Sequence, residues 1–161
     1  MYYTFVYPYL IYCMEVWGNA CDNQLKPLVQ IQKKCIRTIT FSHYLEHTRP
    51  LFEKLNILSF KKLVIQRISL LMFKRYLKIL PNPLDKLFIL NNAQHSYNTR
   101  QHINIHTQIA KTERTYRLCS FHGTNIWNHI SKRIPLDVSY ARYKKLSKKY
   151  IQDNEIIYRI K

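Results

Sequence analysis

Glycine is scarce in this chain, with two among 161 residues, and the four cysteines include no CxxC pair. Gly-rich loops that cradle phosphates need several glycines close together, so nucleotide-binding sites of that kind are excluded. Irregularly spaced cysteines argue against a disulfide framework and favour a reducing, intracellular compartment. The apolar residues 2–14 are too few to span a bilayer and do not have the pattern of a signal peptide, so we expect no membrane partner.

Acidic residues are also scarce, with 9 Asp and Glu against 26 Lys and Arg, which gives a net charge of +17. Two-metal catalysis needs carboxylates gathered around paired Mg²⁺ ions, and the aspartate pairs typical of polymerase sites are absent. We therefore expect no enzyme, no cofactor and no small-molecule substrate. The positive charge favours a polyanionic partner, most commonly RNA or DNA, because phosphate contacts release counterions. An ordinary basic surface, or a ribosomal or membrane-surface role, is the alternative.

Three spaced pairs of side chains give weak hints of zinc ligation. They are His43 with His47, His102 with His106, and Cys119 with His122. None continues into a four-ligand pattern with the spacing of a zinc finger, so we interpret them as polar surface residues and expect no metal site.

Hydrophobic periodicity predicts a mainly α protein, a helical bundle with an irregular arm. Expected helices cover residues 5–18, 23–40, 59–80, 121–134 and 140–152, the first as one buried helix and the second capped by Asn23. Residues 91–101 are polar and form the arm, and residues 116–119 could be an edge strand, so a short β-hairpin is an option in the second half. We expect the chain to be organised in three parts: N-terminal helices in residues 1–80, an irregular linker and arm in residues 81–120, and C-terminal helices in residues 121–161.

Two of the expected helices combine an apolar face with a cationic one. Lys26, Lys33 and Arg37 project within roughly 40° of one another on residues 23–40, and Arg67, Lys74 and Lys78 do the same on residues 59–80. A further run of lysines lies on residues 140–152. The candidate nucleic-acid contacts are Lys26, Lys33, Lys34, Arg37, Arg67, Lys74, Lys78, Arg100, Lys144, Lys145, Lys148 and Lys149.

Aromatic residues make up 14% of the chain, and several adjoin a basic residue. Base stacking combined with phosphate contact would use such neighbours. The alternative is that most tyrosines pack at helix edges with the hydroxyl toward water. The neighbours in question are Arg75 and Tyr76, Tyr97 and Arg100, Tyr116 and Arg117, and Tyr143 and Lys144.

Five segments of the chain follow one another in an order and spacing that match a single protein family. They are Tyr7-Pro8-Tyr9-Leu10 through Trp17-Gly18-Asn19, Leu25 through Gln32-Lys33-Lys34-Cys35-Ile36-Arg37, Pro50-Leu51-Phe52, His95-Ser96-Tyr97-Asn98-Thr99-Arg100-Gln101, and Gly123-Thr124-Asn125-Ile126-Trp127-Asn128. Together they resemble the region downstream of the polymerase domain in jockey-like non-LTR retrotransposon reverse transcriptases, and the resemblance extends over roughly residues 5–150.

The resemblance implies that the catalytic palm aspartates and their Mg²⁺ belong to an upstream reverse transcriptase domain, and that this region follows the thumb. It implies a non-catalytic C-terminal fragment that helps to hold template RNA and target DNA. Nuclear residence would follow from how such elements integrate. The sequence departs from members that end in a zinc knuckle, because its cysteines do not have that spacing. The alternative function is a docking scaffold that packs on the polymerase domain and makes no nucleic-acid contact of its own.

Overall fold

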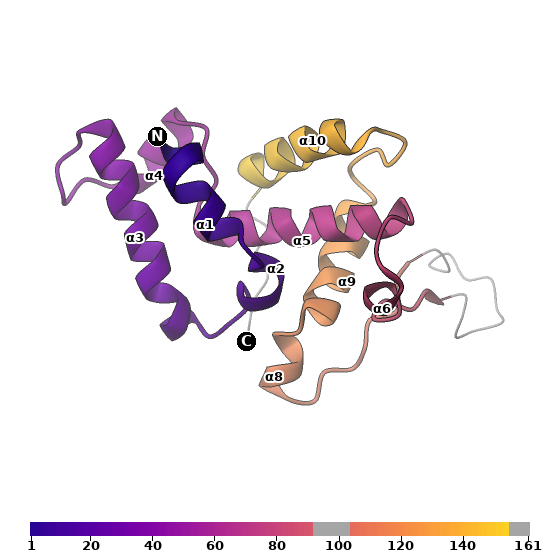
Figure 1. Ribbon diagram of the computed structural model, residues 1–161. Coiled ribbons are helices and arrows are strands. Elements are labelled where there is room, and N and C mark those ends of the chain that lie inside the picture. Colours follow the sequence, from indigo (N-terminus) through magenta and orange to yellow (C-terminus); the bar gives the residue numbers. More distant parts are fainter. Residues whose placement is uncertain (92–103, 155–161) are drawn as a thin grey trace. The chain divides into compact units, whose positions relative to one another are not determined.

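The computed structural model describes residues 1–91 and 104–154, and these residues are mainly helical, which confirms the predicted fold class (Figure 1). The chain divides into two compact units, Met1–Arg67 and Ile68–Lys161. The boundary falls inside helix α5 (Phe60–Tyr76), away from the boundaries expected near residues 80 and 120. The physical reason is that α5 contributes buried side chains to the core of each unit, among them Leu63 in the first and Met72 in the second.

The first unit is built from short and long helices that precede α5. They are the π-helix η1 (Tyr2–Val6), α1 (Tyr7–Ile11), α2 (Met14–Trp17), α3 (Asp22–Thr40) and α4 (Thr48–Lys54). The sequence predicts a linker at residues 42–50 before a short segment at residues 51–55, but α4 already begins at Thr48.

The expected single buried helix at residues 5–18 is wrong in two respects. The chain leaves the helical conformation at Tyr12 and Cys13, where Cys13 has a φ of 48°, and the Trp17 indole donates a hydrogen bond of 2.7 Å to the Tyr12 carbonyl. Several of its apolar side chains are exposed, including Tyr9 at 81% and Val16 at 78%. The aromatic content of this stretch therefore does not mark a buried element.

The helix α3 matches the predicted position closely, although Cys21 and not Asn23 occupies its N-cap. Its buried face includes Gln32, whose amide donates to the Tyr2 hydroxyl at 2.8 Å and to the Leu58 carbonyl at 3.1 Å. Burial raises the pKa of Tyr2, and the Gln32 hydrogen bond partly offsets this effect. Buried polar groups that are paired in this way hold η1 and the segment before α5 on α3.

The helix α5 is shorter than the expected residues 59–80. It ends at Tyr76, and Lys78 adopts a left-handed conformation with a φ of 56° while its amide donates to the Arg75 carbonyl. The predicted division into one apolar and one cationic face is wrong for this helix, because Ile68, Ser69, Leu70, Met72 and Phe73 are all buried. Burial around most of its circumference makes α5 a core helix and leaves no continuous charged face.

In the second unit the segments after α5 form α6 (Asn82–Asp85), α8 (Glu113–Tyr116), α9 (Cys119–Ile130) and α10 (Tyr140–Asp153). The expected edge strand at residues 116–119 is wrong, because these residues end α8 and begin α9. Among the described residues, β-type pairing is limited to an antiparallel bridge between Leu90 and Ile105. The expected arm at residues 91–101 lies, apart from residue 91, outside the described residues.

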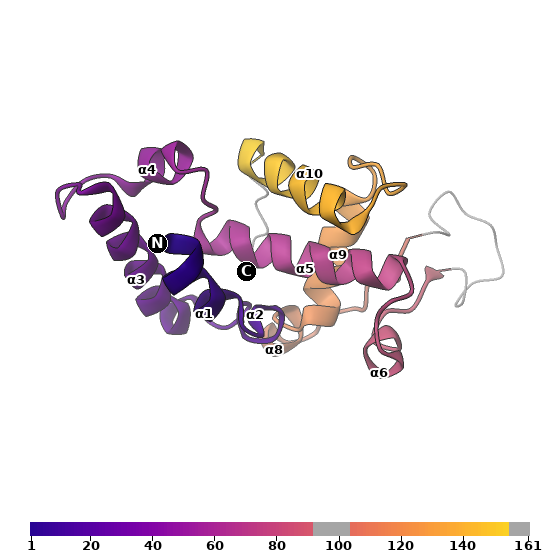
Figure 2. The ribbon, with the colours of Figure 1, turned by 45° about the horizontal axis from the view of Figure 1, so that its top comes forward.

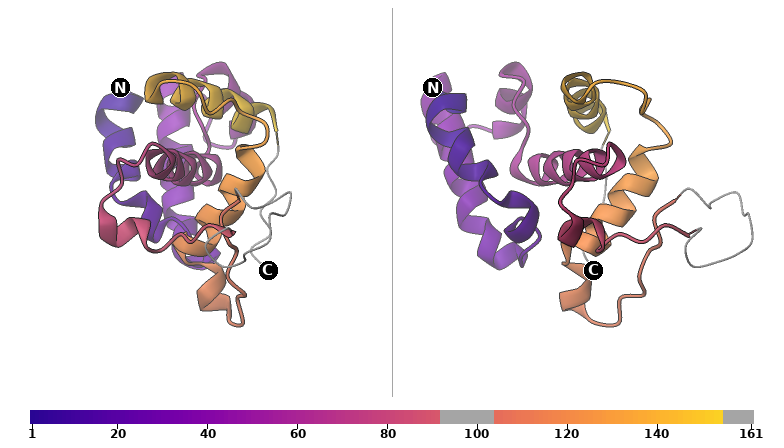
Figure 3. Two further views of the ribbon diagram at one scale, coloured as in Figure 1. Left: turned by 90° about the vertical axis from the view of Figure 1, so that its right-hand side faces the viewer. Right: turned by 45° about the vertical axis from the view of Figure 1, so that its right-hand side comes forward.

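The helices α9 and α10 pack on the part of α5 that belongs to the second unit (Figures 2 and 3). Gly123 of α9 allows the closest approach, since a Cβ at this position would lie 2.9 Å from the Met72 sulfur. On α10, the fully buried Tyr143 ring stacks on Phe73 with centroids 3.9 Å apart, and its hydroxyl lies 2.8 Å from that of Ser69. Burial raises the pKa of Tyr143 to about 12. No helix in the described part of the chain is both long and apolar enough to cross a membrane.

The buried His122 of α9 predicts a loss of stability in mild acid. Burial lowers the pKa of its imidazole below the ordinary value of about 6.5, so the unfolded chain takes up the proton more readily than the folded one. Stability is therefore full above pH 6.5 and falls as the pH drops toward the folded-state pKa. We expect a loss of up to about 1.4 kcal/mol per pH unit in the free energy of unfolding, measured by urea titration at several pH values.

The matched variants for this measurement are His122→Gln and His43→Gln. The first should flatten the acid slope, while the second, at an exposed position, should leave it unchanged. Part of the slope will remain in His122→Gln, because burial and the nearby Arg133 and Lys132 also lower the pKa of His129. An equal slope in wild type and His122→Gln would contradict the assignment.

Candidate nucleic-acid interface

The densest group of cations in the described chain lies on α10. At about 100° per residue, five basic side chains cover about 160° of the helix circumference. All are exposed except Lys148, which is half-buried. We call this group the α10 basic surface: Arg142, Lys144, Lys145, Lys148 and Lys149.

The helix holds these cations on one side because its other side is apolar and buried. Tyr143, Ser147 and Ile151 recur every four residues and are buried, and Ser139 caps the first turn by accepting a hydrogen bond from the Arg142 amide. The anchoring of Tyr143 against Phe73 and Ser69 sets the rotation of α10 about its axis. The cations therefore point away from the core of the second unit.

Like charges on the α10 basic surface repel one another. Lys144 with Lys148, and Lys145 with Lys149, stand at the i,i+4 spacing at which equal charges cost a few tenths of a kcal/mol each. Within α10, Asp153 is the one acidic residue against these five cations, and it stands four residues after Lys149. An external polyanion would relieve the repulsion, and such relief adds to the entropy gained from counterion release.

Two more cations lie in the segment that follows α9, and one of them contacts α10. The Arg133 guanidinium donates a hydrogen bond of 2.7 Å to the Tyr150 hydroxyl of α10, and both Lys132 and Arg133 are exposed. Sequence analysis missed these two residues and Arg142. The signal for Arg142 was present, because it precedes Lys145 by three residues and Lys149 by seven, which places all three on one strip of a helix.

A second basic surface lies on α3 in the first unit. Lys26, Lys33 and Lys34 are exposed, and Arg37 is half-buried with its Nε donating to the Glu46 carbonyl at 2.9 Å. These four residues are called the α3 basic surface. Lys26, Lys33 and Arg37 share one side of α3, as the helical spacing predicted, and this side faces away from Leu25, Gln32 and Ile36.

The remaining predicted contacts lie elsewhere. The Arg67 guanidinium forms an ion pair of 2.7 Å with the Glu15 carboxylate, and these side chains are only 25% and 18% exposed. The Lys74 ammonium lies over the Tyr140 ring, 5.6 Å from its centroid. Lys78 is exposed but follows the end of α5, and Arg100 lies outside the described residues. Arg67 is therefore not part of either basic surface.

The aromatic residues that adjoin a basic residue in the sequence differ in how deeply they are buried. Tyr143 is fully buried and its hydroxyl lies beside that of Ser69, so it neither offers its ring to a base nor turns its hydroxyl toward water. Tyr76 is partly exposed and packs near Phe73, Tyr116 packs edge-on against Phe121, and Tyr97 lies outside the described residues. The exposed rings of the first unit had no such sequence signal; they lie on η1 and α1, at Tyr12 and in the loop after α3.

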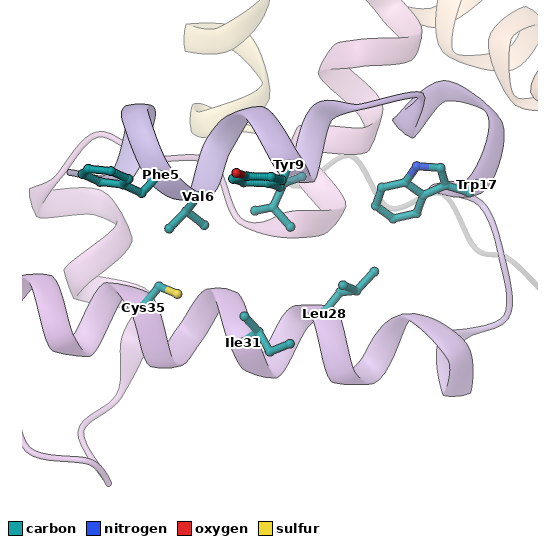
Figure 4. A pocket seen from close by; sticks show the side chains of 8 residues that line it. Phe5, Val6, Tyr9, Trp17, Leu28, Ile31 and Cys35 are labelled. Atoms are coloured by element: carbon teal, nitrogen blue, oxygen red, sulfur yellow. The ribbon is translucent and has the colours of Figure 1, made fainter.

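An apolar groove runs between α1 and α3 within the first unit (Figure 4). It has a volume of about 380 Å³. Among its lining side chains, Phe5 of η1, Tyr9 of α1 and Ile31 of α3 are exposed. The lining residues are Phe5, Val6, Tyr9, Leu10, Trp17, Leu28, Ile31 and Cys35.

Within the described ranges, no three His, Cys, Asp or Glu side chains are grouped closely enough to hold a metal ion. Two of the three spaced pairs, His43 with His47 and Cys119 with His122, lie inside these ranges, whereas His102 of the third pair does not.

No protein-family model, no curated protein and no solved structure matches the chain.

Proposed function

We propose that the chain binds RNA or DNA through phosphate contacts and does no chemistry on it. The observation that carries the proposal is the α10 basic surface, five cations on one side of a helix whose other side is buried. Phosphate contacts of this kind need no base readout, so the binding is expected to be independent of sequence. The α3 basic surface offers a second set of contacts of the same type.

The biological setting we propose is an accessory C-terminal region of a jockey-like non-LTR retrotransposon reverse transcriptase. The support is the ordered set of five segments described above. In this setting the chain would hold template RNA or target DNA for an upstream polymerase domain, which would carry the Mg²⁺ and the catalytic aspartates. The place of action would be intracellular, in the nucleus where such elements integrate.

Salt dependence of binding tests this function. We expect the purified chain to bind a labelled single-stranded RNA and a DNA duplex at low salt, and to lose affinity steeply toward physiological salt. If four or five cations each neutralise a phosphate, the plot of log affinity against log salt for the duplex should have a slope of about −4. The measurement is fluorescence anisotropy over a salt series. Absence of binding at the lowest salt would overturn the proposal.

The second candidate function is a docking scaffold that packs on the upstream polymerase domain. The observation that favours it is the apolar groove, together with the neighbouring exposed side chains of Tyr12 and Val16. Exposed apolar patches of this kind often mark protein interaction sites. A chain that binds no nucleic acid at low salt but associates with the polymerase domain would favour the scaffold over the phosphate-contact function.

A further inference from the structure

The loop between α3 and α4 presents two aromatic rings to solvent. Phe41, the first residue after α3, is 97% exposed, and Tyr44 is 72% exposed. Figure 1 shows this loop extending beyond the end of α3 before the chain returns to α4. Large apolar side chains this exposed contribute nothing to the core of the folded unit.

Phe41 holds an unfavourable backbone conformation at this position. Its φ is 53° and its ψ is 32°, the left-handed region that glycine or asparagine usually fills at the end of a helix. The conformation closes the helix, because the Phe41 amide donates to the Thr38 carbonyl and the Ser42 amide to the Arg37 carbonyl, but a bulky residue is uncommon at this position. Since the ring is almost fully exposed, packing does not compensate for the backbone cost.

The loop is nevertheless held in a defined shape. The Arg37 Nε donates to the Glu46 carbonyl at 2.9 Å, and the Ser42 amide donates to the Arg37 carbonyl at 3.0 Å. The hydroxyls of Thr40 and Ser42 lie 2.8 Å apart, and the rings of His43 and Tyr44 have centroids 4.6 Å apart. The exposed rings therefore have a preorganised backbone, which lowers the entropic cost of binding.

Cations precede these rings along the last two turns of α3. The Phe41 amide donates to the carbonyls at the end of α3, within one helical turn of Arg37. Lys33 and Lys34, both exposed, lie one further turn back along α3. Exposed rings at the end of a cationic helix face match the needs of single-stranded nucleic acid, whose bases stack on aromatic rings while its phosphates meet Lys and Arg.

We propose that Phe41 and Tyr44 form a stacking platform for unpaired bases of a single strand whose phosphates lie along the α3 basic surface. The inference rests on the proposed function and narrows it from nucleic acid in general to single strands, RNA or DNA. A duplex does not use the platform, because its bases are already stacked on one another. Every base has an aromatic face, so the platform adds affinity without adding sequence specificity.

The test compares a strand that has bases with one that has none. The probes are fluorescent oligothymidylate and oligouridylate of about 20 nucleotides, and an abasic DNA strand of the same length and charge; this length exceeds a typical single-strand site. We expect wild type to bind oligothymidylate about tenfold or more tightly than the abasic strand, as one stacked base would supply. The oligouridylate arm shows whether RNA is the preferred source of the bases.

Variants assign the effect to the loop. Phe41→Ala with Tyr44→Ala should lower the affinity for oligothymidylate to that for the abasic strand and leave the abasic affinity unchanged. Phe41→Trp should retain the wild-type preference, and Phe41→Leu should lose most of it although it stays apolar. Tyr12→Ala is the matched control, because Tyr12 is an exposed ring outside this loop. Circular dichroism verifies that each variant folds.

Three results would overturn the inference, and they differ in whether the proposed function is lost with it. Equal wild-type affinity for oligothymidylate and the abasic strand would refute the stacking platform and leave phosphate binding intact. No binding to any probe at low salt would remove the proposed function and the platform with it. Loss of the base preference in Tyr12→Ala as large as in the loop variant would likewise refute the assignment to Phe41 and Tyr44.

Discussion

The triple variant Arg142→Glu, Lys145→Glu and Lys149→Glu should bind nucleic acid on the order of a hundredfold more weakly than wild type at low salt. Each phosphate contact that is lost lowers the slope of log affinity against log salt by about 0.9 on a duplex, so the slope should flatten by about 2 to 3. These three side chains are exposed and share one strip of α10. Because Glu and Lys have similar helix propensities, α10 itself should stay folded.

The control for this variant is a second triple charge reversal, which changes the net charge equally but at residues outside α10. Lys86, Lys111 and Arg114 are exposed residues of the same unit that lie outside α10. Their combined reversal to Glu changes the charge by the same amount, so it corrects for the long-range field of the whole chain. Equal losses in the two triple variants would mean that net charge alone drives binding, and the α10 basic surface would have no special role.

The largest loss of stability is expected from Tyr143→Ala. Its ring is fully buried and stacks in parallel on Phe73, with an interplanar angle of 3°, and its hydroxyl is paired with Ser69. Removal of a large buried aromatic side chain costs about 3–5 kcal/mol through lost burial and the cavity that remains. The measurement is the free energy of unfolding from urea titration followed by circular dichroism.

Tyr143→Phe separates the ring from its hydroxyl. This variant keeps the stack on Phe73 and leaves the buried Ser69 hydroxyl without Tyr143, so about 1 kcal/mol should be lost. Nucleic-acid binding should persist in Tyr143→Phe and fall in Tyr143→Ala at temperatures where α10 detaches. A loss below about 1 kcal/mol in Tyr143→Ala would contradict the anchoring of α10 through this ring.

Helical periodicity located the two helices that carry the basic surfaces. For α3 and α10, apolar residues recur with the helical period and cations occupy the remaining side, so position and charged face could both be predicted from local spacing. Prediction failed for the first helix, because aromatic residues at 5–18 have helical spacing whether or not another element covers them. The predicted edge strand at residues 116–119 was also wrong: these residues have a composition typical of strands, but they join the end of α8 to the start of α9.

The roles of single side chains could be predicted less well. Nothing local distinguishes Arg67 from the other cations, yet the distant Glu15 pairs with it. Tyr143 and Phe41 each lie near basic residues in the sequence, but one is fully buried and the other almost fully exposed. Such differences depend on which elements pack together, and short-range patterns do not contain that information.

The sequence by itself determined the helical class, the excess of positive charge and the cationic faces of α3 and α10, because these properties depend on composition and on spacing within one helix. Tertiary structure alone decided that α5 is buried on most sides, that Arg67 is paired, and that the rings of Phe41 and Tyr44 are exposed. The physical reason is that burial and pairing arise between segments far apart in the chain, where side-chain contacts replace water.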